Sequence, residues 1–190
     1  MLFRSARVDT VRDNMVEKLK RAGINWLAFG YEAGDKRVRQ DADKDFAPGL
    51  IERTTQKVRE AGIYIIANFI FGLPEDDLQT MQETLALALD LNCEFANFYC
   101  AMAYPGSQLY QTAMKLSWPL PKTWLGYSQH SVDTLPLPTK HLNGLDVMRF
   151  RDKAFDTYFS SPRYLEMIRQ KFGEATTQHI RRSEEHTSEL

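Results

Sequence analysis

Cysteine is scarce in this sequence of 190 residues, which contains only Cys93 and Cys100. Two cysteines cannot form a disulfide framework, and this scarcity fits a reducing compartment, so we expect a cytoplasmic protein. On one strand they would lie on opposite faces, and buried free thiols are the simplest interpretation. The histidines His130, His141 and His179 are scattered without ligand spacing, so we assign no residue to a metal.

Long apolar runs and an excess of charge are also missing. No stretch reaches the roughly 20 apolar residues that a membrane helix needs, and we expect no membrane span. The opening MLFRSARVD lacks the apolar block and cleavage site of a signal peptide. Lys plus Arg number 24 against 25 Asp plus Glu, a net charge of -1, which gives no electrostatic reason to expect nucleic acid as a partner.

The common catalytic motifs are absent as well. The sequence contains no G-x-S-x-G, no H-E-x-x-H and no Walker A loop. We therefore predict no catalytic side chain from motifs alone, and any function must be argued from the strand ends.

Both ends of the sequence look artificial. The last nine residues, RSEEHTSEL at 182–190, match the translation of a common sequencing adapter, and we leave them out of the fold argument. A plain polar tail is the alternative. A strand pattern at 2–8 has nothing before it to pair with, so we expect the chain to be a fragment.

Strand and helix patterns alternate through the first 116 residues. Apolar residues at helical spacing or in β-branched runs, bounded by glycine and proline, separate the segments. We expect strands at 2–8, 24–32, 63–72 and 95–104, and helices at 10–22, 48–61, 77–91 and 107–116. This alternation predicts an α/β fold with parallel strands, either an open sheet or a barrel, with ligands at the carboxyl ends of the strands.

The sequence changes character after residue 116. Two proline-bearing stretches, SWPLPKTW and TLPLPTK, predict an irregular connection, and apolar periodicity beyond them predicts helices. We divide the chain into a barrel part at 1–116, a C-terminal extension at 117–181 and the tail at 182–190.

Two polar side chains stand out on the predicted strands. Alternation along 63–72 places an apolar set on one face, and Asn68 with Ile70 and Gly72 on the other. An unpaired amide there would cost a few kcal/mol, so Asn68 needs a partner: a ligand, a neighbouring backbone group or a buried water. Glu32 ends its strand after the small residues Ala28 and Gly30. We expect its carboxylate either to face a ligand or to pair with a lysine.

The acids that follow Gly72 have a structural interpretation. Glu75, Asp76 and Asp77 precede a helix, where capping and the helix dipole favour carboxylates. Pro74 stiffens the turn, and a glycine at 72 allows a backbone or a ligand to approach closely.

Four segments in order resemble the C-terminal half of a radical S-adenosylmethionine (radical SAM) core domain. They are NWLAFGYEAG at 25–34, QDADKDF around Lys44, EAGIYIIANFIFGLPED at 60–76 and YPGSQLY at 104–110, and the likeness spans roughly residues 4–110. The branch it resembles often carries a cobalamin-binding domain. The resemblance implies a partial (β/α)6 barrel of which this chain holds the last strands.

The resemblance also implies a set of cofactor-binding residues. Glu32 matches the polar residue that ends the fourth strand of the family, and Lys44 a basic or polar ligand in the following segment. Asn68 matches the position that hydrogen-bonds the ribose diol of SAM. Met102 is placed beside the adenine by the sixth strand.

The adenine-binding motif G-x-I-x-G-x-x-E is matched in part. Ile70 and Gly72 fall on its I-x-G core, and Glu75 on its last acid. Asn68 stands where the motif has its first glycine, which makes this motif less diagnostic here.

The resemblance implies cofactors that the chain cannot hold by itself. Enzymes of the family bind SAM beside a [4Fe-4S] cluster held by three thiolates of a CxxxCxxC loop, and this sequence has no such loop. We therefore expect the fragment to be inactive alone. The intact protein would need an electron donor such as flavodoxin or ferredoxin, with cobalamin as an additional candidate cofactor.

The implied reactions are methylation or rearrangement of an unactivated small-molecule substrate through a 5′-deoxyadenosyl radical. Trp118, Trp124, Tyr127 and His130 are candidates for substrate contact or for plain packing. Two other readings stay open: a metal-free (β/α) barrel enzyme that binds a phosphorylated metabolite, and a binding domain without catalysis.

Overall fold

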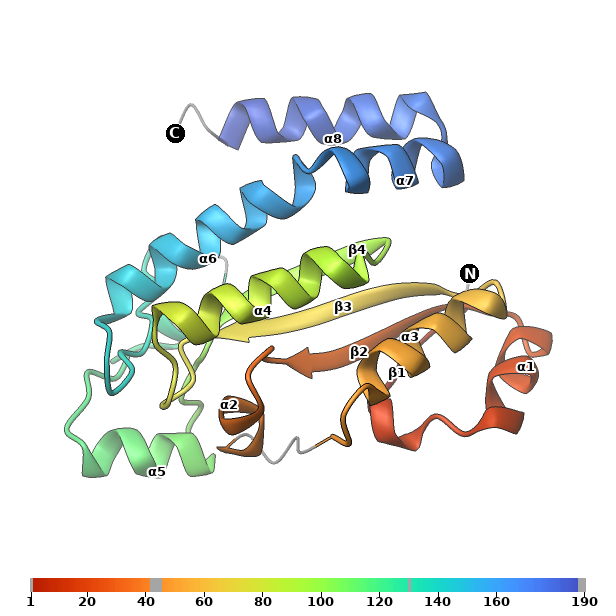
Figure 1. Ribbon diagram of the computed structural model, residues 1–190. Helices are drawn as coiled ribbons and strands as arrows, with labels where there is room; N and C mark the ends of the chain where they lie inside the picture. Colours follow the sequence, from red (N-terminus) through yellow and green to blue (C-terminus); the bar gives the residue numbers. More distant parts are fainter. Residues whose placement is uncertain (1, 42–45, 130, 188–190) are drawn as a thin grey trace.

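The computed structural model describes residues 2–41, 46–129 and 131–187 (Figure 1). The predicted ligand Lys44 and the substrate-contact candidate His130 lie outside these residues. The strands are β1 (Leu2–Ala6), β2 (Ile24–Glu32), β3 (Tyr64–Phe71) and β4 (Phe95–Cys100). The helices are α1 (Asp13–Arg21), α2 (Lys36–Asp41), α3 (Leu50–Glu60), α4 (Leu78–Leu91), α5 (Gln108–Lys115), α6 (Gly144–Phe159), α7 (Pro162–Phe172) and α8 (Glu174–Thr187), with short 3-10 turns η1 (Val8–Thr10) and η2 (Trp124–Tyr127).

The four strands form one parallel sheet in the order β1-β2-β3-β4. This confirms the predicted α/β fold with parallel strands, and the described strands make an open sheet that does not close into a barrel. The last strand is shorter than predicted. β4 ends at Cys100, and although the Ala101 N–H still donates to the Phe71 carbonyl at 2.8 Å, residues 101–104 are not part of the strand.

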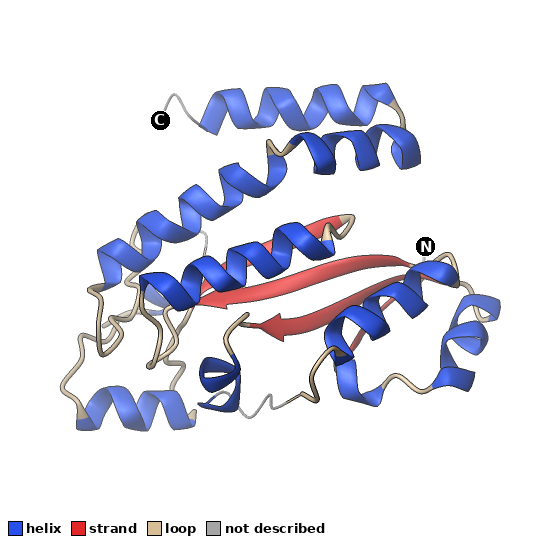
Figure 2. Cartoon of the chain, viewed as in Figure 1, coloured by secondary structure: helices blue, strands red, loops and turns tan. Residues whose placement is uncertain are grey.

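Helices cover one face of the sheet, with α3 and α4 lying across β2 and β3 in Figure 2 and α6 packed along β4. Burial alternates residue by residue along β3, as the strand period predicts. On the covered face, Phe69 lies with its ring centroid 5.6 Å from those of both Tyr31 and Phe98. These cross-strand aromatic contacts join β2, β3 and β4 in one core.

The other face is partly covered, at the amino ends of β2 and β3. Phe172, at the end of α7, stacks on Trp26 with ring centroids 6.1 Å apart and contacts Tyr64 at 5.0 Å. By the alternation of side chains along β2 and β3, Trp26 and Tyr64 both lie on this face. The end of α7 therefore covers the part of this face that lies over Trp26 and Tyr64.

Buried hydrogen bonds attach the C-terminal helices to the segment that leads into β4. The Tyr158 hydroxyl donates to the Cys93 carbonyl at 2.6 Å, and the Tyr164 hydroxyl donates to the Glu94 carbonyl at 3.3 Å. The Glu94 carboxylate accepts from the Ile65 backbone at 2.8 Å and pairs with Lys171. A fully buried carboxylate needs this full set of partners.

Across the described part of the chain, a search for a helix with the length and apolar character of a membrane span finds none.

Candidate functional site

The backbone is strained where β2 ends. Glu32 has φ 63°, a left-handed conformation that side-chain-bearing residues rarely adopt, and the Ala33 N–H donates to the Tyr31 carbonyl at 3.0 Å across it. The ladder to β3 is irregular at this point, since its partners change from Gly30 with Asn68 to Glu32 with Phe69. Such bulges redirect a side chain, and strained residues concentrate at functional sites.

The loop after Glu32 is held against α4. The Gly34 N–H donates to Thr84 Oγ1 at 2.8 Å, and a Cβ on Gly34 would lie 2.5 Å from the Glu83 backbone. Arg39 donates to the Ala33 carbonyl at 2.8 Å. These contacts fix the turn in its strained form.

Asn68 has protein partners on both neighbouring strands. Its Nδ2 donates to the Phe29 carbonyl at 3.0 Å, and its Oδ1 accepts from Asn97 Nδ2 at 2.9 Å. The backbone partner that we left open as an alternative to a ligand is therefore present. Each amide still has hydrogen-bonding capacity beyond these contacts, because a carboxamide has two N–H groups and two acceptor lone pairs.

Sequence reasoning missed Asn97. Alternation along 95–100 places it on the same face as Asn68, but only the ladder shows that the two residues are direct neighbours in register.

An apolar cavity of about 390 Å³ lies next to this amide pair, at the carboxyl ends of β3 and β4. Two predicted cofactor-binding residues, Ile70 and Met102, line it together. Its lining is Ile70, Leu73, Tyr99, Cys100, Ala101, Met102, Tyr104, Leu109 and Gln129. Ile70 has the same strand parity as Asn68, two residues further along β3, so the cavity and the amides share one face.

Gly72 does not join this set. Its φ is 81°, and a Cβ there would lie 2.6 Å from Val147 Cγ1 of α6. β3 ends at Phe71, so the alternation that places Asn68 and Ile70 on one face does not extend to Gly72. The glycine is required by the turn and by the approach of α6.

Asp76 holds the same turn from inside. Its carboxylate is 1% exposed and accepts from the Gly72 N–H at 2.9 Å, the Leu73 N–H at 3.0 Å and Thr80 Oγ1 at 2.7 Å. Burial raises the pKa of Asp76 to about 6, although these hydrogen bonds favour the charged form.

The neighbouring acids have structural partners, and Asp77 caps a helix as predicted. Asp77 is the N-cap of α4 and forms a capping box with Thr80, and the bond from the Thr80 N–H is the main reason why the pKa of Asp77 is lowered. Glu75 pairs with Lys140. Of the predicted substrate contacts, Trp124 is 74% exposed, and Tyr127 stacks on Tyr104 with centroids 5.9 Å apart.

The described residues do not fit an iron–sulfur cluster. Cys93 and Cys100 are both buried, and burial raises the pKa of their thiols to about 12 and about 11. Thiolates are the species that bind iron, and these thiols stay protonated. No group of three or more His, Cys, Asp or Glu within the described ranges is arranged to hold a metal ion.

The same region does fit a nucleoside. An apolar cavity takes a flat base, and the adjacent amides have the donors and acceptors that ribose hydroxyls need.

Comparisons with known proteins give consistent likenesses. No protein-family model matches the chain. An uncharacterized methyltransferase of Pyrococcus horikoshii is 24% identical over 161 residues, which is 85% of this chain and 34% of that protein. The anaerobic magnesium-protoporphyrin IX monomethyl ester cyclase of Rubrivivax gelatinosus is 30% identical over 104 residues, 54% of this chain and 19% of that protein.

Among solved structures, coproporphyrinogen III oxidase (HemN) from Escherichia coli, described as a radical SAM enzyme, superposes with a TM-score of 0.59. The two are 18% identical, and the likeness covers 82% of this chain and 31% of that one. The chain thus spans about a third of the length of the first curated relative and of this structure. The fold of this chain is therefore similar to about a third of that radical SAM enzyme.

Proposed function

We propose that this chain contributes the SAM-binding part of a radical SAM enzyme. In this proposal the adenine occupies the cavity lined by Ile70 and Met102, and the amides of Asn68 and Asn97 hydrogen-bond the ribose hydroxyls. Glu32, at the strained end of β2, is a further acceptor at the rim, and Lys44 stays a proposed ligand by resemblance.

The observation that carries the proposal is the pairing of an apolar cavity with an adjacent amide pair on one face of the sheet. Both lie at the carboxyl ends of parallel strands, where α/β folds bind their ligands. Phe172 packs on Trp26 and Tyr64 at the amino ends of β2 and β3, at the opposite end from the proposed ligand position.

The chemistry of the proposed enzyme comes from cofactors. A [4Fe-4S] cluster would have to be held by cysteines other than Cys93 and Cys100, and when bound it would supply the electron for reductive cleavage of SAM. Flavodoxin or ferredoxin is the proposed external donor. The role of this chain's residues is to hold the nucleoside end of SAM and to shield it from water.

The names of the relatives support a broad reaction class and do not identify a substrate. One is named a methyltransferase and another a cyclase, and both names fit our proposal of methylation or rearrangement at an unactivated position of a small molecule. Cobalamin remains a candidate cofactor of the intact protein.

The arrangement of charges disfavours the phosphate-binding alternative. A phosphate would use the backbone N–H groups at the start of α4. The carboxylate of Asp77 accepts from Thr80 there, and the carboxylate of Asp76 occupies the preceding N–H groups of Gly72 and Leu73.

Calorimetric titration of the chain with SAM tests the proposal. Asn68→Leu should weaken binding by about tenfold, because it removes the amide hydrogen bonds to the ligand, and circular dichroism should show a retained fold. Ile66→Val, on the same strand face but two residues nearer the covered end, is the matched control and should stay within about twofold. Equal affinities of wild type and Asn68→Leu would contradict the assignment.

The proposed cluster has its own test. Protein expressed from the intact gene and reconstituted without oxygen should contain about four iron and four sulfide per chain. Iron-free protein under those conditions would favour a binding domain without radical chemistry.

A further inference from the structure

A groove of about 420 Å³ runs along the outer edge of β4, beside α6. Its lining is Asn97, Phe98, Tyr99, Gln129, Arg151, Asp152, Phe155 and Asp156. Tyr99 and Gln129 also line the apolar cavity assigned above to adenine. The groove therefore opens next to the proposed cofactor position.

The groove follows an edge strand. β4 is the last strand of the sheet, and the Ala101 N–H donates to the Phe71 carbonyl on its inner side. Backbone groups alternate in direction along a strand, so those of Cys100 and Phe98 point outward. An unpaired edge of this kind can accept another extended chain.

A side chain of the protein already makes the bonds that such a chain would make. The Cys100 N–H donates to Gln129 Oε1 at 3.2 Å, and Gln129 Nε2 donates to the Cys100 carbonyl at 2.7 Å. A carboxamide has the same donor and acceptor as a peptide group. Gln129 thus pairs with the outward backbone groups of Cys100. The next outward N–H and C=O along the edge belong to Phe98, which lines the groove.

The charges around the groove favour a basic ligand. Arg151 and Asp152 form an ion pair at 2.6 Å, while Asp156 forms no ion pair within residues 2–41, 46–129 and 131–187. The groove therefore has one uncompensated negative charge. Asn97 donates one N–H to Asn68 and keeps its Oδ1 for an incoming donor.

We infer that this groove binds an extended peptide segment of a separate substrate molecule, with a lysine or arginine facing Asp156. The peptide backbone pairs with Phe98, and the residues nearest Gln129 reach the cofactor cavity. The assignment of the peptide as substrate depends on the proposed function, whereas peptide binding itself does not.

The probe is Nα-acetyl-lysine N-methylamide, which carries one peptide group on each side of a basic residue. The norleucine analogue has the same backbone without the ammonium group. Titrations of the isotope-labelled chain, followed by NMR at low ionic strength, should move the backbone signals of Phe98 and Gln129. The lysine probe should bind about three- to fivefold more tightly than the norleucine probe, and added salt should remove the difference.

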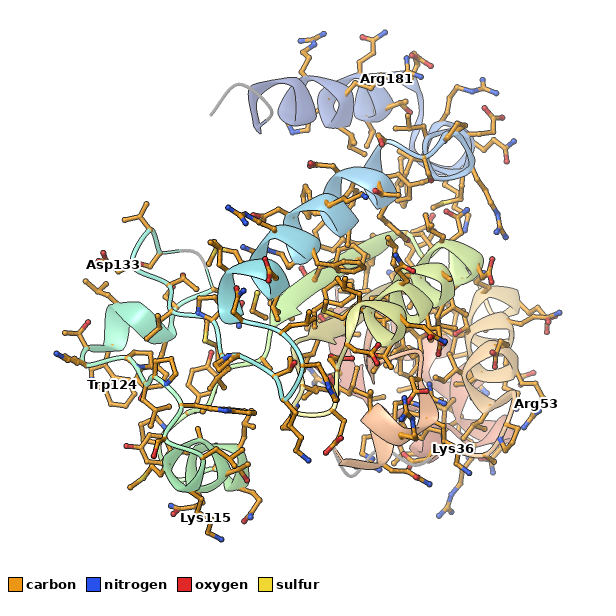
Figure 3. All side chains as sticks on the ribbon, turned by 60° about the vertical axis from the view of Figure 1, so that its left-hand side comes forward. Lys36, Arg53, Lys115, Trp124, Asp133 and Arg181 are labelled. Carbon is orange, nitrogen blue, oxygen red and sulfur yellow. The ribbon has the colours of Figure 1, made fainter. Side chains whose placement is uncertain are left out.

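Two variants locate the charge effect. Asp156→Asn should abolish the preference for lysine while the norleucine probe binds as before. Asp133→Asn removes an equal charge from an exposed loop, seen apart from α6 in Figure 3, and should leave the preference unchanged.

The inference would be overturned by equal binding of both probes to wild type, by an Asp156→Asn variant that still prefers lysine, or by signal changes that map to another face. Self-association of the chain through the same residues would also overturn it. SAM affinity, measured on the same samples, separates the two proposals. Lysine preference without SAM binding supports the groove and overturns only the proposed function.

Discussion

At the scale of single residues, the candidate site contains polar side chains, such as Asn68 and Asp76, that are hydrogen-bonded to other residues of the protein. Asn68 bonds to β2 and β4 at once, so it ties the three strands together and also orients Asn97. Asp76 ties the turn after β3 to the start of α4. A ligand at this end of the sheet would therefore meet a preorganised surface.

The Asp76 carboxyl makes stability depend on pH. Its folded pKa of about 6 lies above the ordinary aspartate value of 3.8, so the folded state binds more protons between these values. Its stabilising contribution is complete below about pH 4 and is lost as the pH rises through about 6. We expect Asp76→Asn to gain stability relative to wild type between about pH 4 and pH 7, by roughly 2 to 3 kcal/mol in urea unfolding.

Asp77→Asn is the control for this measurement. The pKa of Asp77 is lowered in the folded state, so its contribution is lost as the pH falls, and the variant should show a pH trend of opposite sign. A flat difference between Asp76→Asn and wild type would contradict the assignment.

At the scale of elements, the end of β3 is shaped by α6 from a distant part of the chain. Gly72 allows the left-handed turn and leaves space for Val147, while Asp76 fixes the two N–H groups that follow the strand. The position of the turn beside the apolar cavity is thus set by helix packing.

Gly72→Ala should destabilise the protein by about 2 to 4 kcal/mol, from the left-handed backbone and the clash with Val147. Val147→Ala removes the clash but not the backbone strain. In a double-mutant cycle we expect the pair to be about 1 kcal/mol more stable than the sum of the single changes. Strict additivity in urea unfolding would show that the contact does not limit this turn.

At the scale of the whole molecule, the C-terminal helices share a core with the sheet. Tyr158 and Tyr164 bond to the entry of β4, and Phe172 covers Trp26. The boundary at residue 116 that we drew from composition stays a prediction, but the helices beyond it complete the sheet's packing.

We therefore expect the chain to unfold in one transition. In a Trp118→Phe, Trp124→Phe background, Trp26 is the single tryptophan and reports the contact with Phe172. Its fluorescence and the far-ultraviolet circular dichroism should give the same urea midpoint. Separate midpoints would show that the helices detach before the sheet unfolds.

The sequence by itself determined the parallel α/β class, the covered face of β3 and the capping role of Asp77, because these follow from local periodicity and chain-neighbour chemistry. Only the tertiary structure decided that Asn97 is the partner of Asn68, that Glu32 is strained, and that Gly72 faces Val147. Those features depend on the register between strands and on the packing of a helix about 70 residues away, which no local pattern encodes.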